Sequence, residues 1–394
     1  MTHARLPHDP ARRRWLGGAL ALAALGTVPG ARAVSLPCKK PAWPDWRAFV
    51  ARHVQDDGRV IDFATADQRS TSEGQSYALM FALIDNDQPM FERVLGWTRH
   101  NLMDDQAYER LPAWLWGRAA DGQWRVLDDN NATDADLWIA YALIEAGRLW
   151  NRAGYTSAGM RKLQLVREQV VVPVPGLGPM LLPGRQGFRN GDRFTFNPSY
   201  VPLQILRRFA GADPKGPWRA LLTNSAKMIA GSAPAGFAAD WIGWDGKAFG
   251  VDPAKGGIGS YDAIRVYLWA GMLDRGEPLR ARLLQDLSGP MGMLRSDGRL
   301  AEKIDTVRGV GTGNAPPGFA AALLPYLSAL NETALLKDQA QRIPAATSAA
   351  GVALPYFERT LVLFGQGWLE NRYRFAADGR LLPAWRTNPC SAKI

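Results

Sequence analysis

Histidine is scarce in this chain of 394 residues, which contains only four. His3 and His8 lie close to the N-terminus, and neither His53 nor His100 stands at a metal-ligand spacing or beside a nucleophile motif. We expect His53 and His100 on the surface of outer helices. The sequence therefore predicts no metal ion, no organic cofactor and no histidine-based catalytic triad, and the remaining candidates for chemistry are carboxylates.

Long apolar runs are missing from all but the first part of the chain. Three arginines at 12–14 precede an apolar run from Trp15 to Leu25, and residues 31–33 read Ala-Arg-Ala. These features predict a secretory signal peptide over 1–33 and a periplasmic or secreted protein. The arginines also approximate a twin-arginine signal, so general secretory and twin-arginine export both stay open. No later run reaches the ~20 apolar residues of a membrane helix, and we expect no membrane span in the mature chain.

Charge of one sign does not accumulate anywhere. The formal net charge of +10 includes the arginines of the signal segment, and no Lys/Arg block or nucleic-acid-binding motif is present. We therefore expect no nucleic-acid partner and a substrate that is neutral or weakly charged.

Cysteine occurs only twice, at Cys38 and Cys390. The two positions lie at opposite ends of the mature chain, so in an oxidising compartment one disulfide would tie the termini together. The alternative is a pair of unrelated thiols.

Helical periodicity is the main feature that the chain does have. Very apolar segments alternate strictly with amphipathic ones that carry Arg, Lys and Glu on one side. The apolar segments are 72–84, 134–147, 199–211, 262–273, 318–330 and 355–368, and the amphipathic ones are 45–55, 89–101, 157–170, 216–229, 277–288 and 333–342. This alternation predicts an all-α barrel of six helical hairpins, with an inner apolar ring and an outer ring that is polar outside.

The mature chain shows no internal boundary. No Gly/Ser-rich or Pro-rich linker divides it, so we expect one domain over 34–394. The segment 172–198 is predicted to hold one or two β-hairpins, and a long loop over 104–131 is rich in tryptophan. Gly309–Gly313 is glycine-rich, but no strand precedes it, and we interpret it as a loop rather than a phosphate-binding turn.

Acidic residues stand at three of the predicted helix starts. Glu73 directly follows Ser72, and Asp134 directly follows Thr133. Asp262 lies two residues after Ser260. Thr133 and Asp136 have the spacing of a capping box, which accounts for Asp136 but not for Asp134. The alternative is that all of these acids only stabilise helix starts.

Paired carboxyl groups are the chemistry that cleaves glycosidic bonds. One protonates the leaving oxygen and the other is a nucleophile or activates water, and Glu73 and Asp262 fit this pair. A helix start favours a charged carboxylate, so a general acid at Glu73 needs a raised pKa. Burial and a nearby ionised Asp134 would both raise it.

Three motifs resemble glycoside hydrolase family 8. Residues 132–150 (ATDADLWIAYALIEAGRLW) resemble the family signature, 72–77 (SEGQSY) resemble its S-E-G-Q-G-Y segment with Ser76 in place of Gly, and 260–265 (SYDAIR) resemble its Y-D-A-x-R segment. The motifs occur in the family's order. The resemblance implies an (α/α)6 barrel and an inverting enzyme.

The resemblance also implies roles for individual residues. Glu73 matches the general acid, Asp262 the base, and Asp134 the group that grips the distorted sugar. Tyr200, in the segment Asn197-Pro198-Ser199-Tyr200, would hold the attacking water, and Arg265 would pair with Asp262. The alternatives are that Tyr200 packs in the core and that Arg265 bridges to a neighbouring helix.

Tryptophan is abundant, with 15 residues in all. Aromatic rings cover the flat faces of sugars, and Trp114, Trp116 and Trp138 flank the acidic motifs, so we predict them as sugar platforms. Four others lie at apolar helical positions and are expected in the core: Trp97, Trp150, Trp218 and Trp269.

Together these features predict endo-acting hydrolysis of β-1,4-glucan (cellulose) with inversion. Within the family, the size, the export signal and the lack of an extra binding domain resemble the enzymes that accompany bacterial cellulose synthase, which makes a synthase complex a candidate partner. Related hydrolases of chitosan, xylan or mixed-linkage glucan are alternatives within the family. A non-catalytic glucan-binding protein is an alternative of another class, and the scarcity of histidine argues against a polysaccharide lyase.

Overall fold

The computed structural model describes residues 42–106, 109–343 and 354–387. The predicted signal peptide and both cysteines, Cys38 and Cys390, lie outside the described residues, so these predictions stay open. The described residues form one compact unit.

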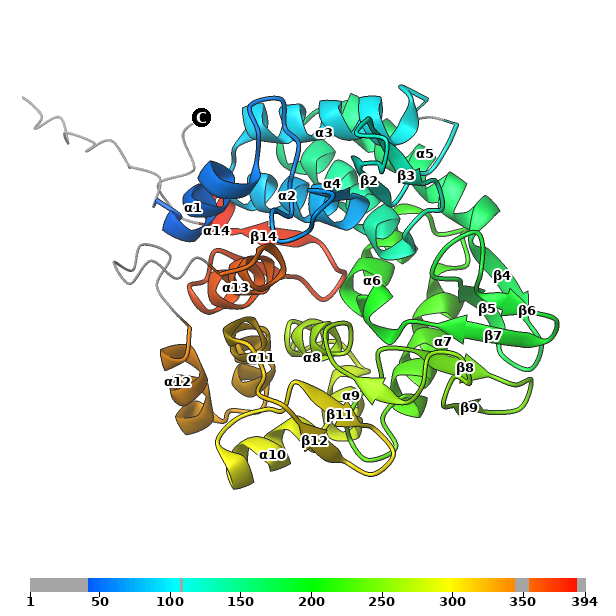
Figure 1. Ribbon diagram of the computed structural model, residues 1–394, viewed down its shortest axis with the longest axis vertical. Helices are drawn as coiled ribbons and strands as arrows, with labels where there is room; N and C mark the ends of the chain where they lie inside the picture. The colour runs from blue at the N-terminus through cyan, green and yellow to red at the C-terminus, as the bar shows by residue number, and fades with distance from the viewer. Residues whose placement is uncertain (1–41, 107–108, 344–353, 388–394) are drawn as a thin grey trace, which may run out of the picture. The chain divides into compact units, whose positions relative to one another are not determined.

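Six largely buried helices form the inner ring that the periodicity predicts (Figure 1). They are α2 (Ser72–Ile84), α4 (Thr133–Leu149), α6 (Leu203–Ala212), α8 (Ile264–Gly271), α11 (Pro317–Ala329) and α13 (Tyr356–Leu369). In α4 every residue except Arg148 is buried, as a helix that is apolar all round requires. The segment predicted over 199–211 begins instead with a 3-10 turn at Pro198–Tyr200, and α6 starts only after Pro202, because proline restricts the residue before it.

The amphipathic segments form the outer helices. They are α1 (Pro44–His53), α3 (Gln88–Met103), α5 (Ala153–Gln169), α7 (Trp218–Gly231), α9 (Arg280–Asp286), α10 (Gly289–Asp297) and α12 (Thr333–Gln341), and α14 (Ala384–Thr387) closes the described chain. The predicted helix over 277–288 is the short α9, and α10 follows it. The break falls at 287–288, and α10 then begins with Gly289, whose N–H donates to Gly236 O at 3.0 Å, and Pro290, which has no N–H.

The inner helices approach one another closely because small residues face their neighbours. A Cβ at Gly365 of α13 would lie 1.8 Å from the carbonyl oxygen of Ala321 in α11. A Cβ at Gly271 of α8 would lie 2.2 Å from the backbone nitrogen of Tyr326 in α11. Any larger side chain at either glycine would push the ring apart.

Aromatic rings from four inner helices meet inside the ring. Trp138 of α4 packs against Tyr77 of α2, Trp269 of α8 and Phe364 of α13, with ring centroids 5.3–6.0 Å apart. Phe364 also meets Tyr77 and Phe81 edge-on, which joins α13 to α2. The barrel centre is therefore a packed core and not a channel.

Within the part of the chain that the structure describes, short antiparallel strands extend from the loops and form five small sheets. Their orders are β1-β2-β3, β4-β5, β6-β7-β8-β9, β10-β11-β12 and β13-β14. The bounds are β1 (Ser70–Thr71), β2 (Leu115–Arg118), β3 (Trp124–Asp128), β4 (Val171–Val174), β5 (Gly178–Leu181), β6 (Arg189–Asn190), β7 (Arg193–Phe196), β8 (Ile242–Trp244), β9 (Phe249–Gly250), β10 (Ile258–Gly259), β11 (Lys303–Asp305), β12 (Val310–Thr312), β13 (Tyr373–Phe375) and β14 (Leu381–Pro383).

The hairpins predicted within 172–198 are confirmed as β4-β5 and β6-β7. The loop predicted at Gly309–Gly313 is wrong in its middle, because Val310–Thr312 pairs with β11. Gly309 and Gly313, both with positive φ, flank that strand. Among the described residues no helix is both long and apolar enough to cross a bilayer.

The surface position predicted for His53 is also wrong. Its ring is 3% exposed and Nδ1 lies 3.1 Å from the carbonyl oxygen of Ile61. Burial lowers the pKa of His53, so the imidazole is a neutral core group. His100 is exposed and pairs with Asp105.

Candidate active site

Glu73 lies in the first turn of α2, where strand β1 runs directly into the helix. Thr71, and not Ser72, caps the helix, because Thr71 Oγ1 accepts a hydrogen bond from Gly74 N at 3.1 Å. The backbone of Ser72 is fixed by Trp114, whose carbonyl oxygen lies 3.0 Å from Ser72 N. Gly74 has no side chain because a Cβ there would lie 2.5 Å from the hydroxyl of Tyr356.

The Glu73 carboxyl is half-buried, and its environment favours the protonated form. Burial, followed by the negative charge of Asp134, raises the pKa of Glu73 to about 8. These are the two causes that a general acid at this helix start requires. At neutral pH the group keeps the proton that it would donate.

Asp134 begins the inner helix α4 and is almost completely buried, with 1% exposure. Its Oδ1 accepts from Ala135 N at 2.9 Å, and Oδ2 accepts from Arg265 Nη1 at 3.0 Å. Burial raises the pKa of Asp134 to about 6, while Arg265 opposes the shift. Asp134 is thus held by a cation at the point where it approaches Glu73.

The capping box predicted for Thr133 and Asp136 is not formed. Thr133 Oγ1 donates to the carbonyl oxygen of Leu182 at 2.6 Å, and Asp136 accepts from Asn131 Nδ2 at 2.6 Å. Ala132 stands at the N-cap and makes no side-chain cap. Burial raises the pKa of Asp136 and the positive charge of Lys162 lowers it, so a tertiary partner and not the helix start accounts for this acid.

Arg265 joins three inner helices. From α8 its guanidinium donates to Tyr77 Oη of α2 at 2.9 Å and to Asp134 of α4. It also donates to Asp262 Oδ1 at 2.5 Å, three residues earlier in the chain. The side chain therefore pairs with Asp262 and also bridges to neighbouring helices, so the two interpretations of Arg265 are compatible.

Asp262 lies in the turn before α8, and its side chain is 28% exposed. The backbone N–H groups of this turn donate to Asp240, a residue that the sequence analysis did not single out. No motif surrounds Asp240, and its place beside Asp262 is visible only in the folded chain.

Tyr200, in the 3-10 turn before α6, lies among the three acids. Its pKa is raised well above the ordinary value, first by burial and then by the negative charges of Asp134, Glu73 and Asp262. Its ring centroid is 5.7 Å from the Arg265 guanidinium. The structure therefore brings Glu73, Asp134, Asp262, Arg265 and Tyr200 into one cluster.

The three predicted tryptophan platforms lie in different surroundings. Trp138 has no exposed surface and packs in the barrel core, so the prediction of a sugar platform there is corrected. The position of Trp138 along the helix does not reveal this, because only the folded chain shows that α4 is buried on all sides. Trp97, Trp218 and Trp269 are buried as expected, and Trp150 is half-buried against Phe91 and Tyr155.

Trp114 and Trp116 are half-buried beside the start of α2. Trp116 stacks on the exposed Trp124 at 5.4 Å, and the guanidinium of Arg59 lies 4.4 Å from the Trp116 ring. Trp241 is a further half-buried aromatic residue that the sequence analysis missed. It stacks on Phe188 with an interplanar angle of 4° and lies 6.1 Å from Tyr200.

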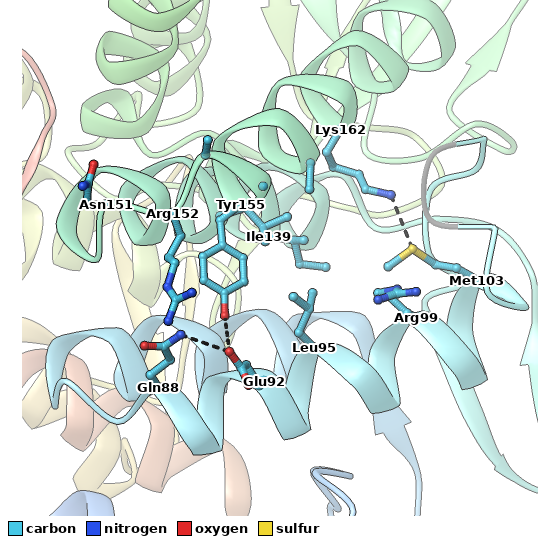
Figure 2. Close-up of a pocket in the computed structure, with 14 residues that line it drawn as sticks. Gln88, Glu92, Leu95, Arg99, Met103, Ile139, Asn151, Arg152, Tyr155 and Lys162 are labelled. Carbon is cyan, nitrogen blue, oxygen red and sulfur yellow. Dashed lines mark hydrogen bonds between the residues drawn. The ribbon is translucent and has the colours of Figure 1, made fainter.

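A separate cavity of about 550 Å³ lies between α3 and α5, and none of the three acids lines it. At one end Lys162 Nζ lies 3.4 Å from Met103 Sδ, and at the other Glu92 accepts hydrogen bonds from Gln88 and Tyr155 (Figure 2). Its apolar middle includes Leu95 and Ile139. Within the described ranges no three His, Cys, Asp or Glu side chains gather as metal ligands.

Comparisons with known proteins show which family the chain belongs to. The profile described as "Glycosyl hydrolases family 8" matches residues 31–371. An endoglucanase of Xanthomonas axonopodis pv. citri is 66% identical over 380 residues, which cover 96% of this chain and 99% of that protein.

Solved structures agree as well. An endo-1,4-D-glucanase of Vibrio fischeri superimposes with a TM-score of 0.80 at 38% identity, covering 88% of this chain and all of that one. An endo-β-1,4-glucanase of Acetobacter xylinum has a TM-score of 0.66 at 26% identity over 82% of this chain and 98% of its own. With the profile match spanning most of its length, and with an (α/α)6 barrel that carries the acids at the helix starts, the chain belongs to family 8 of the glycoside hydrolases.

Proposed function

We propose that this glycoside hydrolase is an endoglucanase that cleaves internal β-1,4 bonds of cellulose chains with inversion at the anomeric carbon. The observation that carries the proposal is the contrast between two carboxyl groups of one cluster. Glu73 is kept protonated by burial and by Asp134, whereas Asp262 is partly exposed and accepts a charged hydrogen bond from Arg265. One group is suited to give a proton and the other to take one.

In the proposed reaction Glu73 gives its proton to the glycosidic oxygen as the bond to the anomeric carbon breaks. A water attacks that carbon from the opposite face and passes a proton to Asp262. Tyr200 lies among the acids, where its hydroxyl would hold this water, and Asp134 would grip the distorted sugar. Solvent then returns a proton to Glu73 and removes one from Asp262.

The choice of β-1,4-glucan is supported by the relatives, which are named as endoglucanases at up to 66% identity, and by the weak net charge of the chain. Trp114 and Trp116 are proposed as sugar platforms beside Glu73, because each is half-buried at the start of α2.

The proposal includes an exported enzyme in the periplasm or outside the cell. It depends on the arginines and apolar run of residues 1–33. A cellulose synthase complex is the proposed partner, from the resemblance of size and signal given above.

Reducing-end release from a panel of glycans tests the substrate. We expect carboxymethylcellulose and cello-oligosaccharides to be cleaved fastest, and chitosan, xylan and mixed-linkage glucan more slowly. Faster cleavage of one of these three would assign the chain to that substrate instead. No release from any glycan, with retained binding, would leave a glucan-binding protein.

Proton NMR during the first minutes of cello-oligosaccharide hydrolysis tests the stereochemistry. Inverting pairs are separated by roughly 6.5–9.5 Å and leave room for water, whereas retaining pairs stand about 5–5.5 Å apart. We expect the α-anomer as the first product. An initial β-anomer would indicate a covalent intermediate, with Asp134 as the leading candidate for the nucleophile.

A further inference from the structure

Asp240 lies outside every motif, yet its carboxylate accepts hydrogen bonds from the backbone of the turn that carries Asp262. Its Oδ1 accepts hydrogen bonds from the backbone nitrogens of Ser260 at 2.7 Å, Asp262 at 3.1 Å and Ala263 at 2.7 Å. One of these donors is the N–H of Asp262 itself. A single oxygen therefore constrains the backbone before, at and after the proposed base.

Asp240 holds the turn that leads into α8 and not the helix start itself. The first N–H groups of α8, from Ile264 to Val266, donate to the backbone carbonyl oxygens of Ser260, Asp262 and Ala263. The N–H groups of Asp262 and Ala263 find their acceptor in a residue more than twenty positions earlier in the chain.

The segment that carries Asp240 is itself anchored from both sides. Asp240 N donates to the carbonyl oxygen of Ile258 at 2.8 Å, and the neighbouring Ala238 N donates to Tyr267 Oη of α8 at 2.8 Å. Hydrogen bonds thus fix the segment around Asp240 to α8 and to β10, so that Asp240 offers the turn an acceptor at a fixed position.

The position holds two acidic side chains close together. Burial, followed by the negative charge of Asp262, raises the pKa of Asp240 to about 6, and the N–H groups of the turn oppose the shift. Accepting these backbone N–H groups does not by itself need a second carboxylate beside Asp262, because the side-chain oxygen of serine or asparagine also accepts them.

We propose that Asp240 is the positioning residue of the base: by holding the N–H groups of Ser260, Asp262 and Ala263 it fixes the direction in which Asp262 meets the attacking water. Asp240 touches neither substrate nor water in this role. The inference rests on the proposed function, since it needs Asp262 to be the base. Misplacing a reacting group by about 1 Å costs on the order of 10²-fold in rate.

The test compares Asp240→Ala with Asp240→Asn, which keeps one acceptor oxygen. The control is Asp245→Ala. Asp245 is an exposed aspartate that also accepts two backbone N–H bonds, from Lys247 and Ala248, but in the turn between β8 and β9. We expect Asp240→Ala to lower kcat by about 10²-fold with KM little changed, Asp240→Asn to lower kcat by roughly 10-fold, and the control to keep kcat within twofold.

Rescue of turnover by azide distinguishes a positioning role of Asp240 from a purely structural one, because azide would not restore activity that was lost through misfolding. It attacks the anomeric carbon without giving up a proton, so the C–O bond breaks, a C–N bond forms and Glu73 still protonates the leaving oxygen. Azide should therefore restore turnover of Asp240→Ala, with a glycosyl azide as product. Wild-type kcat in Asp240→Ala, or a loss that azide does not restore in folded protein, would overturn the proposal.

The variants also distinguish a failure of the positioning role of Asp240 from a failure of the proposed function. If Asp240→Ala does not fold, Asp240→Asn decides, and wild-type kcat or a loss without azide rescue there rejects the role. If Asp262→Asn keeps wild-type kcat, Asp262 is not the base and the proposed function itself fails. An inactive Asp262→Asn beside a fully active Asp240→Ala rejects only the positioning role.

Discussion

Arg265 Nη1 lies 3.0 Å from Oδ2 of Asp134, and both side chains are more than nine-tenths buried. The pair joins α8 to α4 across 131 residues of sequence. A buried ion pair adds little net stability when intact, but its loss leaves an uncompensated charge. The Arg265–Asp134 contact is therefore better explained by the arrangement of the acids than by stability of the barrel.

Removal of the Arg265 cation should lower both the catalytic rate and the stability of the protein. Arg265→Met leaves Asp134 and Asp262 without their shared donor, and we expect kcat to fall at least about 10²-fold and stability to fall by about 3 kcal/mol. Arg265→Lys keeps the charge but not the forked contact, and it should recover stability better than kcat. Urea unfolding and steady-state kinetics measure the two. Equal recovery of both by lysine would contradict a positioning role.

Glu73→Gln should abolish hydrolysis while oligosaccharide binding persists. Glutamine keeps the shape of the side chain but has no acidic proton to donate, and general acid catalysis contributes at least on the order of 10²-fold. Calorimetric titration with cello-oligosaccharide checks binding, and Glu168→Gln on the exposed face of α5 is the matched control. Turnover within a few-fold of wild type would remove Glu73 from the acid role.

The same variant should change how stability depends on pH. The pKa of Glu73 is raised to about 8 from 4.5, so the native state favours the protonated form. This contribution to stability is fully present below the unfolded pKa and is lost as pH rises through the folded pKa. We expect Tm of Glu73→Gln minus Tm of wild type to increase between pH 5 and pH 9. A difference that is constant with pH would show that Glu73 is not held protonated by the fold.

Lys162→Met tests the buried partner of Asp136. Lys162 is 2% exposed, Asp136 is fully buried, and burial shifts the pKa of each toward its neutral form while the other opposes the shift. Lys162→Met removes this positive charge and also the hydrogen bond from Nζ to the carbonyl oxygen of Arg110, and we expect a loss of about 1–3 kcal/mol. Lys162→Met with Asp136→Asn should recover part of the loss. Lys227→Met, at an exposed position on α7, should change stability by less than about 0.5 kcal/mol.

Cys38 and Cys390 should be oxidised in the exported protein. Closing so long a loop restricts the unfolded chain, and in the entropy model this contributes several kcal/mol. Thiol titration of unfolded, unreduced protein measures the state directly. Two reactive thiols per chain would show that the cysteines are independent.

Several features followed from local sequence alone. The bounds of α2 matched the periodicity over 72–84, because an apolar helix is recognised from spacing that a short window contains. The three acids at helix starts were visible for the same reason, since each stands one or two residues after a small polar residue and before an apolar run. The five-sheet arrangement was foreseen only as hairpins in the loops.

Contacts between distant segments decided the rest. The sequence placed Trp138 beside the acids, but only the packing of Tyr77, Trp269 and Phe364 around it shows that it is core. Asp136 has the spacing of a cap, yet its partners come from the preceding loop and from α5.

By itself the sequence determined the alternation of buried and half-exposed helices, the family motifs and which residues carry carboxyl groups. Only the tertiary structure decided how those carboxyl groups differ, because a pKa depends on burial and on charges that the fold brings near. Arg265 meets Tyr77 across 188 residues, and Asp240 meets the turn of Asp262 from a separate loop. Hydrogen bonds of this kind leave no periodic trace in the chain, since their partners share neither a helix face nor a strand register.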